Sequence, residues 1–125
     1  MVQIARRGTD SPLNVKSKIF AVSAVEMVKQ SNDWRMNSLF QQFLRSSTSI
    51  HANIRESEFA QSPADFVAKL SIARKEANET LGWLEVLYDS NTIDELWFGR
   101  LYPQCNELLS MLTASIKTTK LNSNL

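Results

Sequence analysis

The chain has 125 residues, of which 43% are hydrophobic and 22% charged, and its formal net charge is +1 at pH 7. This length is typical of a single domain that buries a core without disulfides or metals. The balanced charge excludes a global electrostatic pull toward nucleic acid or acidic membranes. Cys105 is the only cysteine, which excludes an intramolecular disulfide and a cysteine-based metal cluster and favours a reducing, cytoplasmic location.

Few residues interrupt helices, since the sequence has only three glycines and three prolines. No apolar run approaches the ~20 residues of a membrane span. The N-terminus also lacks the apolar segment of a signal peptide. We therefore expect a soluble, all-α protein with no membrane partner.

Residues 1–10 are expected to form a flexible lead, followed by a first helix over about residues 12–30. Ser11 offers an N-cap, and Pro12 suits the first helical position, where its missing N–H costs nothing. Two adjacent apolar rows run along this helix. They consist of Val15, Ile19 and Val22, and of Phe20, Ala24 and Met27.

The polar residues 31–33 end this pattern, and a second helix is expected over about residues 34–57. Its apolar stripe consists of Leu39, Phe43, Ile50 and Ile54. Small residues lie between these apolar positions, where they would let a neighbouring helix backbone come close. They are Ser46, Ser47, Ser49 and Ala52.

The third helix is expected over about residues 63–89, with Ser62 as its N-cap and Pro63 as its first residue. Asp65 then lies near the free N–H groups and the positive end of the helix dipole. Apolar and small residues recur in heptad spacing along it: Phe66, Leu70, Ala73, Ala77, Thr80, Leu84 and Leu87. Ile72, Trp83 and Val86 widen this arc, which indicates more than one neighbour.

The fourth helix is expected over about residues 93–119, behind a capping box of Thr92 and Glu95. Its stripe consists of Leu101, Cys105, Leu108, Leu112 and Ile116. Gly99 and Pro103 predict a kink or break near residues 99–103. Residues 120–125 are expected to be a flexible tail. Four helices with short connections predict an antiparallel up-down-up-down four-helix bundle over residues 11–119.

A family resemblance lies between Leu44 and Leu87. The segment LRSSTSIHANIRE, residues 44–56, resembles the second-helix signature of a bacterial four-helix-bundle family encoded in intervening sequences of large-subunit rRNA genes and sometimes labelled as ribosomal proteins. The match continues through residues 60–62, 64–66, 69–73, 75–80 and 83–85. Ser47, His51, Pro63 and Gly82 depart from the family's pattern.

The resemblance implies a homo-oligomer, typically a pentamer with a central channel, and a family without known enzymatic activity. A related branch comprises the accessory protein of diversity-generating retroelements, which binds a reverse transcriptase and nucleic acid through a basic surface. The net charge of +1 places this chain nearer to the general family than to that branch.

Residues suited to catalysis or metal binding are scarce. His51 is the only histidine, so a catalytic triad has little to draw on. No histidine follows a glutamate by three residues, so the ligand pattern of a di-iron bundle is missing. We therefore expect no enzyme, no catalytic residue, no cofactor and no metal.

Two sets of polar residues remain as candidates. Five cations form a candidate surface for a polyanion or acidic partner: Arg45, Arg55, Lys69, Arg74 and Lys75. The alternative is a charge network with Glu56, Glu58, Asp65, Glu76 and Glu79. A second set is expected to make interhelical polar contacts: Asn53, Glu76, Asn78 and Glu79. We expect Asn53 to bond across to the third helix, and the alternative is an exposed asparagine on a helix flank.

Large aromatic residues gather where the third and fourth helices meet, at Trp83, Trp97, Phe98 and Tyr102, and such residues also suit a subunit interface. The sequence as a whole favours a non-enzymatic, homo-oligomeric accessory protein. Its basic residues would bind RNA, DNA or a nucleic-acid enzyme such as a reverse transcriptase. The alternative is a structural or protein-interaction module that binds no nucleic acid.

Overall fold

The computed structural model describes residues 11–31 and 33–125, which form four α-helices and one short 3-10 helix. The elements are α1 (Pro12–Gln30), η1 (Trp34–Met36), α2 (Asn37–Ser57), α3 (Pro63–Asp89) and α4 (Glu95–Ser123). The described residues contain no strand, so the expected all-α class with four helices is confirmed. The flexible lead expected over residues 1–10 lies outside the described residues.

Side-chain caps explain where three helices begin. The Ser11 side chain accepts a hydrogen bond from the Asn14 N–H, and the Ser62 side chain accepts one from the Asp65 N–H. Each serine is followed by proline, whose fixed φ suits the first helical turn. The capping box expected at Thr92 is wrong, because Asp94 caps α4 and accepts from the Trp97 N–H at 2.9 Å. The Thr92 hydroxyl instead lies 2.8 Å from that of Ser90 within the turn.

The other helix ends also differ from expectation. α2 begins at Asn37, after the 3-10 turn η1 that Asp33 caps. α4 runs without a break through Pro103, and both Pro103 and Gly99 are exposed, so the helix continues past the hydrogen bond that proline cannot donate. α4 also continues to Ser123 rather than ending at residue 119. Asn124, with φ 57°, then closes it in the left-handed conformation typical of helix C-termini.

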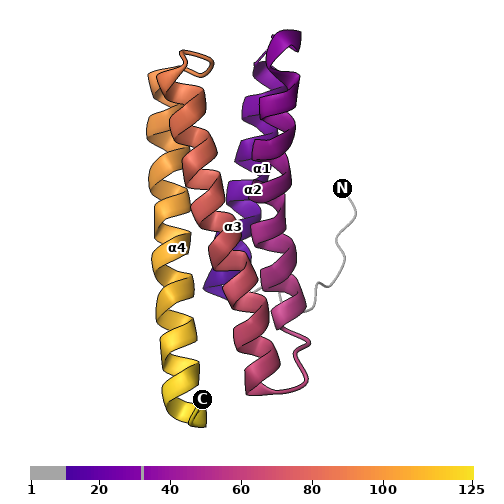
Figure 1. The fold of residues 1–125 in the computed structure, drawn as a ribbon, viewed down its shortest axis with the longest axis vertical. Coiled ribbons are helices and arrows are strands. Elements are labelled where there is room, and N and C mark those ends of the chain that lie inside the picture. The colour runs from indigo at the N-terminus through magenta and orange to yellow at the C-terminus, as the bar shows by residue number, and fades with distance from the viewer. Residues whose placement is uncertain (1–10, 32) are drawn as a thin grey trace, which may run out of the picture.

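The helices pack as a ring in which each touches two neighbours (Figure 1). α1 and α3 each pack against α2 and α4, and no contact joins α1 to α3 among the described residues. Paired residues run in opposite order along neighbouring helices, as Arg45 with Glu79 and Lys69 with Glu56 show for α2 and α3. α1 and α3 therefore lie on opposite corners of the molecule, and each has one side that no other described helix covers.

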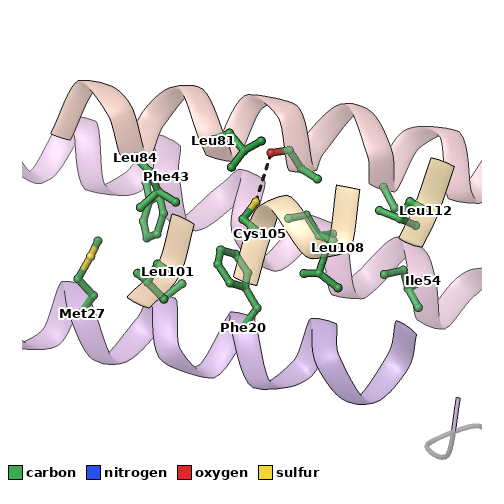
Figure 2. Packing of buried hydrophobic residues seen from close by; sticks show 14 of the residues in the cluster. Phe20, Met27, Phe43, Ile54, Leu81, Leu84, Leu101, Cys105, Leu108 and Leu112 are labelled. Carbon is green, nitrogen blue, oxygen red and sulfur yellow. Dashed lines mark hydrogen bonds between the residues drawn. The ribbon is translucent and has the colours of Figure 1, made fainter. Parts of the chain in front are cut away.

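Apolar residues from all four helices form the core (Figure 2). The α3 seam is buried from Leu70 to Leu87, and the whole predicted stripe of α4 is buried as well. On α1 only the row of Phe20, Ala24 and Met27 is buried. Val15, Ile19 and Val22 remain exposed, so one of the two apolar rows of α1 is not covered by the other described helices.

Candidate functional site

The five basic candidate residues do not share one surface. Arg45 lies between the carboxylates of Glu76 and Glu79, with Nη1 3.2 Å from Glu76 Oε2 and Nη2 hydrogen-bonded to Glu79. Lys69 Nζ lies 3.3 Å from Glu56 Oε2. These contacts cross between α2 and α3, as the alternative of a charge network predicts. Arg45 and Lys69 therefore serve helix packing before any partner binds.

Arg55 lies on the other side of α2, near α1. Its charge and that of Lys18 act on His51, whose Nδ1 lies 2.9 Å from Ser17 Oγ on α1. Burial first, then Arg55 and Lys18, lower the pKa of His51 below its ordinary value, while Glu58 opposes them. The lowered pKa favours the neutral imidazole, which joins α1 to α2 through its hydrogen bond with Ser17.

Arg74 belongs to a third environment, between α3 and α4. It lines a hollow of about 330 Å³ together with Lys117 and Lys120, which we name the α3–α4 basic hollow. None of these three cations forms an ion pair with another described residue. Lys75 follows Arg74 and is exposed.

Sequence reasoning missed Lys117 and Lys120. Their spacing of three residues puts them on one side of α4, which was the available signal. Their meeting with Arg74 depends on how α3 and α4 pack against each other, and one helix read alone does not contain that information.

The predicted interhelical contacts are correct for the glutamates and wrong for Asn53. Glu76 and Glu79 reach Arg45 across the α2–α3 boundary, and the Glu76 side chain is only 15% exposed. Asn53 Nδ2 instead donates to the Ser49 carbonyl at 2.9 Å and to Ser49 Oγ at 3.1 Å, both within α2. The carbonyl one turn back is the nearest acceptor for a short amide side chain, so it competes successfully with α3. Asn78 is exposed.

The aromatic residues at the α3–α4 end are used largely within the chain. Phe98 stacks on Tyr88 with ring centroids 4.3 Å apart, and Tyr102 lies 4.9 Å from Phe98. The Tyr102 hydroxyl donates to Glu85 at 3.1 Å, and the Arg100 guanidinium lies over Trp97. This cluster joins α3 to α4 and is a weaker candidate for a subunit interface than the apolar rows described next.

Two apolar rows are exposed on helices that do not touch each other. The α1 face consists of Val15, Ile19 and Val22, which are 41%, 55% and 49% exposed. The α3 face consists of Ala68, Ile72, Gly82 and Val86, of which Ile72 and Val86 are 44% and 46% exposed. Both sets lie within about 80° of helix surface at 3.6 residues per turn. The α1 face is thus a continuous apolar stripe, whereas Lys75 and Glu79 divide the α3 face into two apolar patches, Ala68 with Ile72 and Gly82 with Val86.

The described residues offer little for metal or thiol chemistry. No group of three or more His, Cys, Asp or Glu residues is placed to hold a metal ion within residues 11–31 and 33–125. The Cys105 thiol is buried and donates to the Ala77 carbonyl at 3.4 Å (Figure 2), and burial raises its pKa to about 12. Across the same residues, no helix has both the length and the apolar content needed to cross a membrane.

These features define the class of the protein: an all-α fold of four helices whose outer surface carries apolar faces and a basic hollow. A family model for the 23S rRNA-intervening sequence protein matches residues 11–114, and the chain belongs to this family. The family resemblance inferred from residues 44–87 is thereby confirmed.

A solved structure agrees with this assignment. A protein with unknown function from the S23 ribosomal protein family of Bacteroides thetaiotaomicron is 41% identical to this chain, with a TM-score of 0.77. The match covers 84% of this chain and 98% of that one. No functionally curated protein matches the chain.

Proposed function

We propose that this chain is a non-enzymatic protein that assembles with copies of itself through two different faces. The observation that supports the proposal is the pair of exposed apolar surfaces, the α1 face and the α3 face. A helix in a monomer normally exposes a polar side, so a sustained apolar row on the outer side favours contact with another molecule.

The positions of the two faces favour a ring. Because α1 and α3 lie on opposite corners, one copy can place its α1 face against the α3 face of the next. Such a head-to-tail contact uses different patches on each partner, and it closes into a ring when the rotation per subunit allows. Lys18, Glu26 and Arg100 border the α1 face. Gly82 adds no side chain to the α3 face, so a partner helix can come near its backbone.

Light scattering on the full chain tests the assembly. We expect the wild type to have a mass several times the 14.2 kDa of one chain. Ile19→Glu on the α1 face and Ile72→Glu on the α3 face should each lower that mass, because a buried unpaired carboxylate opposes association. Leu96→Glu is the matched control, since Leu96 is 83% exposed and outside both faces. A monomeric wild type would overturn the proposal.

Mixing the two variants distinguishes a head-to-tail contact from a symmetric one. Ile19→Glu keeps an intact α3 face, and Ile72→Glu keeps an intact α1 face. A mixture should therefore form a pair of roughly twice the monomer mass, because one of its two possible contacts is undamaged. If each face instead binds the same face of a neighbouring copy, each variant alone already pairs through its intact face, and mixing the two variants leaves the mass unchanged.

A second candidate function is the binding of nucleic acid, and the α3–α4 basic hollow favours it. Arg74, Lys117 and Lys120 converge there without an ion-pair partner among the described residues. Phosphate groups along a backbone neutralise such cations and release counterions, which makes the affinity depend on salt. Arg45 and Lys69 are less suitable, because glutamates already neutralise them.

A salt titration with structured RNA and duplex DNA tests this candidate. Lys117→Ala should reduce the slope of log affinity against log salt by about one, the value expected for one lost phosphate contact. Lys29→Ala removes an equal charge from the last turn of α1 and should leave the slope unchanged. Absence of binding by the wild type at low salt would remove nucleic acid as a ligand and leave the interaction module.

A further inference from the structure

An apolar cleft opens at the end of the molecule where α1 begins. α1 has 19 residues, whereas α3 and α4 have 27 and 29 and extend past its start (Figure 1). The first turn of α1 therefore covers only part of this end. The cleft has a volume of about 480 Å³, within the usual range for a small-molecule site. Its apolar walls are formed by Leu13, Ile54, Phe66, Leu70, Met111 and Ala114.

One charged residue, Glu58, lines this cleft. Its Oε1 accepts a hydrogen bond from Asn14 Nδ2 at 2.7 Å and a longer one from Ser11 Oγ at 3.4 Å. Its Oε2 is buried and has no hydrogen-bond partner among the described residues. A buried carboxylate oxygen usually has a donor, so this group is incompletely satisfied. Glu58 also lines an adjoining hollow of about 490 Å³ with Ser57 and Phe66.

We propose that this cleft binds a small molecule with an apolar body and a protonated amine, and that the ammonium pairs with Glu58. The apolar walls accept the body, and an ammonium supplies both the positive charge and the donors that the carboxylate lacks. Oε2 is buried without a ligand, so the Ser11 hydroxyl, which is exposed and donates to Oε1 at the longer distance, has to give way before an ammonium can reach Glu58. An anionic head group is repelled by the same carboxylate.

This site goes beyond the proposed assembly and nucleic-acid binding. Its lining shares no residue with the α1 face, the α3 face or the α3–α4 basic hollow. Ligand binding and assembly can therefore fail separately, and the two sets of experiments report on different surfaces.

Calorimetric titration of the full chain with three probes of equal chain length tests the proposal. Octylammonium, octanol and octanoate are used at pH 7, below the concentrations at which they aggregate. We expect octylammonium to bind with one site per chain. Octanol should bind at least about tenfold more weakly, because its neutral hydroxyl forms no ion pair with the carboxylate, and octanoate should show no heat of binding. Equal affinity for octylammonium and octanoate, or no binding of octylammonium, would overturn the proposal.

Two variants identify the site. Glu58→Gln replaces the carboxylate by a neutral amide of the same shape. It should weaken the binding of octylammonium about tenfold and leave the affinity for octanol unchanged. Ala114→Trp fills the cleft and should abolish binding of both probes. Thr113→Trp is its matched control, because Thr113 is the adjacent exposed residue and lines the α3–α4 basic hollow instead of the cleft. An unchanged affinity in Glu58→Gln, or equal losses in the two tryptophan variants, would show that the amine binds elsewhere.

Discussion

Replacing Phe43 with alanine is expected to lower the free energy of unfolding by about 3–5 kcal/mol. Phe43 is fully buried and lies among core residues of all four helices (Figure 2). Its removal loses the transfer energy of an aromatic ring and leaves a cavity that helices held on several sides cannot close. A loss of this size is a large fraction of the stability of a typical domain.

Urea unfolding followed by circular dichroism measures this effect. Phe59→Ala is the matched control, because Phe59 is 62% exposed in the connection after α2 and its loss should change stability by less than about 0.5 kcal/mol. Protein concentration is held fixed, since assembly would add to the apparent stability. Similar losses in both variants would show that Phe43 does not lie in the core as described.

Most of the fold is predictable from local chemistry. The Ser62–Pro63 pair predicts where α3 begins, and the heptad spacing that follows predicts which side of α3 is buried. Both predictions depend on residues within one or two turns of each other, so they can be made without knowing which helix packs against α3. The predicted start of α4 was wrong because Thr92 and Asp94 are both suitable N-cap residues. In the structure Thr92 belongs to the turn after Asn91, whose φ is 60°, and Asp94 is the N-cap.

α1 shows the limit of reading periodicity. Its two apolar rows are equally acceptable as a core stripe, and the sequence of one helix does not say which row faces inward. Packing against α2 and α4 selects the row of Phe20 and Met27, because a 19-residue helix at one corner of a ring can bury only one side. The other row is then left as the α1 face.

The candidate site was less predictable because ion pairs form between helices. Arg45 and Arg55 are ten residues apart, which corresponds to about 80° around α2 at 3.6 residues per turn. That rotation is enough to direct Arg45 toward the glutamates of α3 and Arg55 toward His51. Charges on different helices decide which cations are neutralised. Only the packed structure therefore shows that Arg74 meets Lys117 and Lys120 in a basic hollow.

Small residues on α2 lead to the second large expected effect. Ser46 and Ser47 are fully buried, as expected for a close approach of α3, whereas Ala52 is exposed and Ser49 is half-buried. Ser46 Oγ lies 2.8 Å from Thr80 Oγ1 on α3 and donates to the Phe43 carbonyl at 3.1 Å. The Ser46 hydroxyl thus has both a donor and an acceptor. Because Ser46 is fully buried against α3, a larger side chain would have to displace its neighbours.

Ser46→Leu is therefore expected to destabilise the protein by about 1–3 kcal/mol, because extra methylene groups force α2 and α3 apart. Urea unfolding again provides the measurement. Ala52→Leu adds the same side chain at an exposed position of α2 and should change stability by less than about 0.5 kcal/mol. Ser46→Ala separates space from hydrogen bonding, with an expected loss of about 1 kcal/mol. If Ser46→Ala costs as much as Ser46→Leu, the hydroxyl rather than the short distance between helices holds α2 against α3.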